Sequence, residues 1–375
     1  MDSIKDQFRS PGEALAHLLR ERDWTQQDLA TILDRPQKSI SQIVTGKKGV
    51  TPETAIELSN AFGNDPVFWV ELEARYRLSL VQPKKLGVEK RARLYQLAPV
   101  KEMVRRGWIS DASSLEILES ELRHFFDQPS IEDDIEIGAA LRTSFDSKEI
   151  NASQRAWCFR AKQMARAINA ERYNESKFDQ NMQKLRRLAS WPNHASKISS
   201  ALASMGIRFV VIEPLARTKI DGAALWLDEN SPVVAMSARF DRIDSFWHTL
   251  AHELSHIKHR DNAPPDVNLV GDSKPSVDDQ SSIERRADQD ACRFLLDPDE
   301  LSSFIVRVGP LYSRARINQF ANRMKIHPGI IVGQLQFRGE LSYRSMRDTL
   351  VGIRDYVTSE SLTDGWGHFL PDLTR

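Results

Sequence analysis

The segment HELSH, residues 252–256, carries the residue types of a zinc site at the spacing that a helix requires. The surrounding stretch FWHTLAHELSHIKH holds four of the nine histidines in this 375-residue chain. On a helix, residues four apart share a face, so His252 and His256 can point at one ion. Glu253 falls about 100° around the helix, where its carboxylate can reach a metal-bound water without ligating the metal. The spacing therefore predicts a metal-binding helix with a general base beside it.

A catalytic zinc ion needs a third protein ligand and one position open to water. The segment SIERRADQDACRFLL predicts a second helix, and its Glu284 is the candidate third ligand. Asp288 lies one turn further on the same face, where it can accept the N–H of a ligating histidine. Cys292 lies about 12 Å from Glu284 along the helix, too far to share one ion. We expect Cys292 to be a buried structural thiol.

The same residues allow a plainer interpretation, a surface helix that carries histidines by chance. The strands predicted before this helix and the E-x-x-x-D helix after it favour the metal site. His248 and His259 lie near the same helix face and could bind an oxyanion or a substrate carboxylate. We expect no function for either of these two histidines.

The predicted metal site defines a reaction. Zinc lowers the pKa of its water toward 7 and polarises a carbonyl group. Glu253 would take the proton of that water and pass it to a leaving amine. The implied reaction is peptide-bond hydrolysis, with hydrolysis of a small amide as a weaker alternative.

The elements that position these residues begin with a change of pattern near residue 206. The runs GIRFVVIE, GAALWLDE and SPVVAMSA predict three strands, the last two forming a hairpin. Residues 222–227 or 233–237 could be the edge strand that pairs with an extended peptide. The helical pattern resumes at Ile243. The polar, proline-rich segment 260–282 predicts a loop that is long enough to act as a lid.

Composition bounds the class of protein. Hydrophobic residues make up 41% of the chain and charged residues 28%, as in soluble globular proteins. The formal net charge is zero, so any attraction to nucleic acid must come from local patches. Two cysteines, Cys158 and Cys292, exclude a disulfide framework and favour a reducing compartment. The N-terminus lacks a signal-peptide pattern and no run of about 18 apolar residues occurs. We expect a cytoplasmic protein without a membrane span.

Residues 11–80 predict five short helices separated by tight breaks. Thr25 and Asp28 have the spacing of a capping box at the start of one helix. Pro52 stands at the first position of another helix, where proline is favoured. The pattern indicates a compact all-α domain.

At these residues the chain resembles known families. FWHTLAHELSHI and ERRADQDACRFLLDP resemble the ImmA/IrrE family of zinc metallopeptidases, although Ser255 replaces a frequent glycine and Cys292 a phenylalanine or alanine. The resemblance implies that Zn²⁺ is bound by His252, His256 and Glu284, with Glu253 as the catalytic acid and base. DGAALWLDENSPVVAMSARF and INQFANRMKIHPGIIVGQLQ look like the branch of that family fused to a HigA-type helix-turn-helix antitoxin.

The segment WTQQDLATILDRPQKSISQIVTGKKGVTPETAIELSNAFG resembles the Xre-type, lambda-repressor-like helix-turn-helix. Gln26–Leu33 would be the scaffold helix and Gln37–Val44 the recognition helix in the major groove of DNA. The candidate DNA contacts are Gln26, Gln37, Lys38, Ser39, Ser41, Gln42, Lys47 and Lys48. The residues expected in the core are Leu29, Ile32, Ile40, Ile43, Ile56, Leu58 and Phe62. An alternative is a helical domain that serves only dimerisation or toxin contact.

Two functions fit the sequence. The first is a DNA-binding regulator with a zinc endopeptidase domain that cleaves a protein substrate, namely a repressor, a toxin or itself. The second is a HigA-type antitoxin that represses its own operon and binds a toxin, with a sensory or structural metal domain. The intact Glu253 favours the first, because a structural zinc site has no need of a general base. We expect a homodimer, since palindromic operators match two-fold symmetry.

The expected fold is α+β and mostly α. A five-helix, lambda-repressor-like DNA-binding domain at 1–80 precedes a helical connector at 81–200. A zincin-like metallopeptidase domain with a small β-sheet and the HExxH helix follows at 201–300. A C-terminal helical segment at 301–375 is expected to pack on the peptidase domain.

Overall fold

The computed structural model describes residues 8–80, 87–128, 150–261, 266–267 and 282–368 of the chain. By their contacts the residues divide into two compact units, Met1–Val88 and Glu89–Arg375. Each unit has a hydrophobic core of its own. Among the described residues, every helix is too short or too polar to cross a bilayer.

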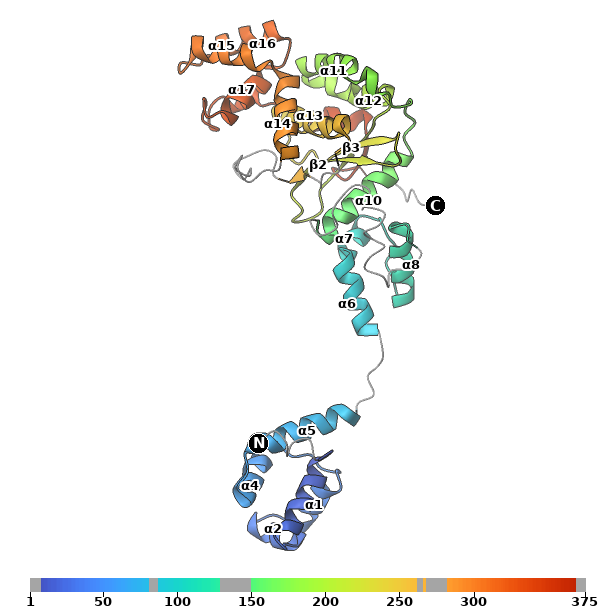
Figure 1. Ribbon diagram of the computed structural model, residues 1–375, viewed down its shortest axis with the longest axis vertical. Helices are drawn as coiled ribbons and strands as arrows, with labels where there is room; N and C mark the ends of the chain where they lie inside the picture. Colours follow the sequence, from blue (N-terminus) through green and yellow to red (C-terminus); the bar gives the residue numbers. More distant parts are fainter. Residues whose placement is uncertain (1–7, 81–86, 129–149, 262–265, 268–281, 369–375) are drawn as a thin grey trace. The chain divides into compact units, whose positions relative to one another are not determined.

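The N-terminal unit consists of the five helices that the sequence predicted (Figure 1). They are α1 (Pro11–Glu21), α2 (Gln26–Ile32), α3 (Gln37–Val44), α4 (Pro52–Phe62) and α5 (Pro66–Leu80). The capping box at α2 is confirmed, because Thr25 accepts from the N–H of Asp28 while the Asp28 carboxylate accepts from the N–H of Thr25. Helix α4 ends at Gly63, whose φ of +75° is the left-handed conformation that glycine adopts without strain.

The core of this unit holds most of the residues that the sequence assigned to it. Leu29, Ile40, Ile43, Leu58 and Phe62 are buried. The prediction was wrong for Ile32 and Ile56, which are 49% and 52% exposed. The buried face of α2 carries Leu29 and Ala30, and that of α4 carries Ala55 and Leu58. Ile56 follows Ala55 by a step of about 100° and therefore points away from the buried face, whereas Ile32 is the last residue of α2.

The second unit is a β-sheet with helices on both faces. Its helices are α6 (Gly87–Leu97), α7 (Val100–Arg105), α8 (Leu115–Phe125), α10 (Ala152–Arg166), α11 (Phe178–Arg186), α12 (Ile198–Ser204), α13 (Ile243–His259), α14 (Ser282–Leu295), α15 (Pro298–Val308), α16 (Arg314–Met324), α17 (Pro328–Phe337) and α18 (Arg354–Glu360). Short 3₁₀ turns are η1 (Glu175–Lys177), η2 (Arg187–Ser190), η3 (Pro192–Lys197) and η5 (Arg347–Thr349). Its strands are β1 (Arg208–Ile212), β2 (Ile220–Trp226), β3 (Pro232–Met236), β4 (Asp266–Val267) and β5 (Leu362–Asp364).

The described strands form one sheet in the order β4-β2-β3-β1-β5. The predicted hairpin is confirmed, because β2 and β3 pair antiparallel and Leu227 donates its N–H to the Ser231 carbonyl at 3.0 Å. β1 pairs in parallel with β3 and with β5. The sequence did not predict β4 or β5, which are only two and three residues long.

Successive side chains of β1 enter different cores, which shows why these runs are almost wholly apolar. Phe209 and Val211 pack in the core with α12 and α13. Val210 and Ile212 pack in the core with α10 on the opposite face. A strand buried on both faces has no polar alternation. Figure 1 shows α10 and α13 on either side of β2 and β3.

Residues from segments far apart in the sequence contact one another in the interior of this unit. Asp364 of β5 forms a buried ion pair with Arg160 of α10, with Nε and Oδ2 2.6 Å apart. The indole N–H of Trp108 donates to the same oxygen at 3.0 Å. The segments that the sequence assigned to a connector, a peptidase domain and a C-terminal tail therefore share one compact unit.

Candidate functional site

The HELSH segment lies in the middle of α13, where the helix is covered by α14 and β2. His252 and His256 are 0% and 1% exposed, so neither ring is a surface histidine. Their ring centroids are 4.8 Å apart. The structure therefore places the two imidazoles together in a buried environment and excludes the chance surface helix.

Glu284 of α14 meets both rings. Its Oε2 atom lies 3.1 Å from Nε2 of His252 and 3.8 Å from Nε2 of His256. One donor atom from each of the three residues lies within 4.8 Å of the others. Zinc bonds of about 2.0–2.2 Å in a tetrahedron space the ligand atoms roughly 3.3–3.6 Å apart. The donor types and their spacing fit a zinc ion.

The other nitrogen of each ring faces a carboxylate. Nδ1 of His252 lies 3.1 Å from Oδ1 of Asp288, the partner that the sequence suggested. Nδ1 of His256 lies 3.1 Å from Oδ2 of Asp261, which sequence reasoning missed. A carboxylate that accepts the Nδ1–H fixes the ring and leaves Nε2 available as a ligand. Both histidines thus have the hydrogen-bonding pattern of metal ligands.

The end of α13 explains how Asp261 reaches His256. Arg260 has φ of +53°, which reverses the chain, and the N–H of Asp261 bonds to the His256 carbonyl at 3.0 Å. The guanidinium of Arg286 on α14 contacts both Asp261 oxygens. In the sequence, Asp261 is only an acidic residue that follows a helix. Acidic residues at such positions are too common to predict the contact with His256.

Glu253 is 1% exposed and lies against the backbone of β2. A Cβ atom added to Gly222 would come within 2.3 Å of its Oε1 atom. Glycine at this position gives the carboxylate room beside the paired imidazoles. The sequence did not identify Gly222 as part of the site.

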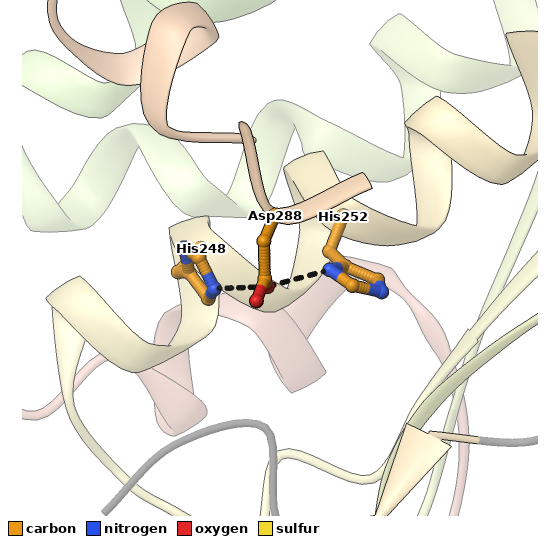
Figure 2. Close-up of side chains that lie close together, drawn as sticks. All are labelled: His248, His252 and Asp288. Carbon is orange, nitrogen blue, oxygen red and sulfur yellow. Dashed lines mark hydrogen bonds and ion pairs between the residues drawn. The ribbon is translucent and has the colours of Figure 1, made fainter. Parts of the chain in front are cut away.

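His248, to which we assigned no function, belongs to a second group around Asp288. Its Nε2 atom lies 3.3 Å from Oδ1 of Asp288, the oxygen that also faces His252 (Figure 2). His248, His252 and Asp288 could also hold a metal ion by spacing alone. That set would take the Nδ1 atom of His252 away from the carboxylate that orients it, so we favour the set with Glu284.

Cys292 and His259 lie outside the candidate set of metal ligands. Cys292 is only partly buried, which corrects the expectation of a buried thiol. His259 lies 3.0 Å from Asp290, which also accepts from Ser255 at 2.8 Å. Ser255 therefore connects α13 to α14 through this hydrogen bond.

The predicted lid, residues 260–282, lies largely outside the described residues. The described pairing decides between the two candidate edge strands. β3 is paired on both sides and offers no edge, so residues 233–237 are excluded. In the described part of the chain, β4 pairs with β2 only at Ile220 and Gly222.

The candidate DNA-binding residues lie on α2, α3 and the turn that follows. Gln37, Lys38, Lys47 and Lys48 are exposed, whereas Gln26, Ser39, Ser41 and Gln42 are half-buried. The ammonium of Lys48 donates to the Ser39 hydroxyl at 3.0 Å, which holds the turn against α3. Arg35 forms hydrogen bonds to Thr54 and Glu57 of α4, so it anchors the start of α3. The exposed Lys38 and Lys47 stay candidates for contacts with DNA phosphates.

The N-terminal helices match a known protein family. The model of the helix-turn-helix family matches residues 15–69 of this chain. The chain is 44% identical over 55 residues to virulence-associated protein A' of Dichelobacter nodosus, covering 14% of this chain and 48% of that protein. It is 39% identical over 57 residues to virulence-associated protein A of the same organism, covering 15% and 56%. The chain thus spans about half the length of these two relatives. No solved structure matches it.

A third relative is matched over most of its length. The chain is 30% identical over 84 residues to the uncharacterized HTH-type transcriptional regulator YddM of Escherichia coli K12, covering 22% of this chain and 88% of that protein. The chain therefore belongs to the helix-turn-helix family. The three relatives are matched over only 55 to 84 residues of this chain.

Proposed function

We propose that this chain is a DNA-binding transcription regulator whose second unit is a zinc-dependent endopeptidase acting on a protein substrate. The main support for a peptidase is the group formed by His252, His256 and Glu284, in which the Nδ1 atom of each histidine faces a carboxylate. The helix-turn-helix family and a relative named as a transcriptional regulator support the DNA-binding part.

When bound, zinc would supply a Lewis acid for the scissile carbonyl and for the attacking water. Glu253 would take the proton of that water and return it to the leaving amine. Its burial against Gly222 keeps the carboxylate away from bulk water, and no ligand role is needed for it. A site built only for structure has no use for this residue.

An extended peptide is the substrate form that fits the sheet. β2 carries Gly222 beside Glu253, and beyond its pairing with β4 at Ile220 and Gly222 the side of β2 opposite β3 is not paired in the described part of the chain. Peptides commonly add to such an edge through backbone hydrogen bonds. We place the substrate backbone along β2, next to β4.

The test of the peptidase compares the wild type with Glu253→Gln in zinc-loaded form. Metal analysis of both proteins should give the same zinc content. New protein N-termini in cells that express each form, including N-termini within the chain itself, should appear only with the wild type. Identical sets of N-termini with both proteins would exclude the peptidase and leave the antitoxin alternative, in which the metal unit is sensory or structural.

The test of DNA binding uses gel shifts on the promoter of the chain's own gene. Lys38→Ala should weaken binding to all sequences and reduce its salt dependence, because a phosphate contact is lost. Gln42→Ala should relax sequence preference, because a base contact is lost. Gln27→Ala on the exposed part of α2 is the matched control. Unchanged shifts with both test variants would remove α3 as the recognition helix.

A further inference from the structure

A small pocket lies beside α13, one helical turn before Glu253. Its walls come from the start of β2, from the end of β3 with the turn after it, and from α13. Met236 and Phe246 form an apolar wall, while Ser245 and Thr249 contribute hydroxyl groups. The free space inside is about 10 Å³, roughly the room that one water molecule needs. The pocket can therefore admit only a small group.

The two hydroxyl groups of the pocket are buried and available for hydrogen bonds. Ser245 and Thr249 are 5% and 3% exposed and lie one turn apart on α13. Within the described ranges of the chain, no hydrogen bond joins either hydroxyl to the backbone or to another side chain. Buried polar groups are normally paired, so an unpaired one needs an explanation. Each hydroxyl can donate one hydrogen bond and accept two, which suits a bound group that also donates and accepts.

The charged side chains of the pocket neutralise each other. The guanidinium of Arg239 lies against the carboxylate of Asp221, with Nε and Oδ1 2.5 Å apart and Nη2 and Oδ2 3.2 Å apart. The same guanidinium lies over the ring of Phe240, 4.3 Å from its centroid. A two-point pair of this kind satisfies both charges. The pocket therefore favours an uncharged group over an ion.

The pocket lies beside the expected path of a substrate peptide. Gly222 lies against Glu253, and Trp226 lies 4.7 Å from the guanidinium of Arg260, so β2 and α13 run in the same direction. The pocket lies toward the start of both elements. Because β4 occupies the edge of β2 at its start, a peptide paired with the rest of β2 is expected to leave the strand near Gly222. Thr249 is one turn of α13 further along that path, about 6 Å from Glu253.

We propose that this pocket binds a serine or threonine side chain of the protein substrate, one or two residues from the scissile bond, an assignment that rests on the proposed peptidase function. The substrate hydroxyl pairs with Thr249 and Ser245, while Met236 and Phe246 contact its carbon atoms. An alanine or valine at that position would leave two buried hydroxyls unpaired and is therefore disfavoured. Sites built to bond a substrate hydroxyl reject analogues without it more strongly than apolar pockets reject an extra methyl group.

The test incubates the zinc-loaded, full-length protein with a library of random peptides and sequences the cleavage products. Serine and threonine should be enriched at one position near the scissile bond, about tenfold or more over alanine and valine. Thr249→Val keeps the shape of the side chain but removes its hydroxyl, so the enrichment should fall toward one. Thr358→Val is the matched control, because this residue is 6% exposed and its hydroxyl donates to the Arg354 carbonyl at 3.1 Å. The control should keep the wild-type enrichment.

A binding measurement separates the pocket from the catalytic step. Zinc-loaded Glu253→Gln should capture peptides from the same library without cutting them, with serine or threonine again enriched. Adding Thr249→Val to this variant should remove the preference. Zinc content and circular dichroism check that each variant folds.

The possible outcomes distinguish the pocket from the peptidase. Cleavage without enrichment, or enrichment that survives in a folded protein with both Thr249→Val and Ser245→Ala, would overturn the pocket and leave the peptidase. Selective capture by Glu253→Gln without cleavage by the wild type would retain the pocket as a peptide site and overturn the peptidase. Neither cleavage nor capture would overturn both.

Discussion

At the residue scale, a carboxylate faces the Nδ1 atom of each histidine in the HELSH segment. Asp288 and Asp261 each accept from the Nδ1 of one histidine and so direct both Nε2 atoms at Glu284. Partners of this kind typically contribute 10–100-fold to metal affinity. The two residues come from different elements, α14 and the turn after α13, so they can be tested separately.

Asp261→Asn and Asp288→Asn should each weaken zinc binding roughly 10–100-fold, since an amide orients the ring less well than a carboxylate. Competition with a chromophoric chelator measures the affinity. Asp348→Asn, which removes an exposed ion pair with Arg314, is the control and should change nothing. Wild-type affinity in both test variants would mean that these carboxylates do not support a metal.

Gly222 gives a second prediction at this scale. Gly222→Ala places a methyl group within 2.3 Å of the present position of the Glu253 carboxylate, so the carboxylate must move. We expect hydrolysis to fall by about 10²-fold or more, as for a misplaced catalytic group, while zinc content stays at the wild-type level. Gly87→Ala, where the added atom meets open space, is the matched control. Full activity in Gly222→Ala would show that Glu253 is not held by β2.

At the element scale, the recognition helix depends on a close contact with α1. A Cβ atom at Gly12 would lie 2.3 Å from the carbonyl oxygen of Val44, at the end of α3. Because the obstacle is backbone, α1 and α3 must move apart to admit a side chain. The contact fixes the orientation of α3 and therefore the surface that its lysine presents.

Gly12→Ala should destabilise the N-terminal unit by about 1–3 kcal/mol, the usual result of overpacking. Urea unfolding followed by tryptophan fluorescence measures this. Lys38→Ala should leave the stability unchanged while it weakens DNA binding, so the two variants separate packing from recognition. A Gly12→Ala protein as stable as the wild type would show that α1 and α3 are free to separate.

At the scale of the whole molecule, the two units have separate hydrophobic cores. A ligand stabilises only the unit that it binds, by about 2.7 kcal/mol at a hundred times its dissociation constant. The predicted metal ligands all belong to the unit Glu89–Arg375. Zinc and DNA should therefore act on different transitions.

Calorimetry should show two unfolding transitions for the full chain. Zinc should raise the midpoint of one of them, and Glu284→Gln should remove most of that effect. A fragment of residues 1–88 should unfold at the midpoint that zinc does not move. A single transition, or an equal effect of zinc on both, would contradict the independence of the units.

The sequence predicted the features that depend on neighbours along the chain. The five N-terminal helices, the capping box at Thr25, the β2–β3 hairpin and the start of α13 at Ile243 follow from caps, turns and periodicity. The faces of α2 and α4 were predicted less well, because Ile32 and Ile56 fit an apolar pattern yet lie outside the contact region.

The sequence by itself determined the helix that carries the histidines, the helix that carries Glu284, and the type of chemistry that such residues perform. These follow from spacing within one element, where the period of the backbone fixes which side chains share a face. Only the tertiary structure decided that Asp261 contacts His256, that Gly222 leaves room for Glu253, and that His248 contacts Asp288. Those contacts join different elements or a reversed helix end, and the packing of the whole unit sets their distances.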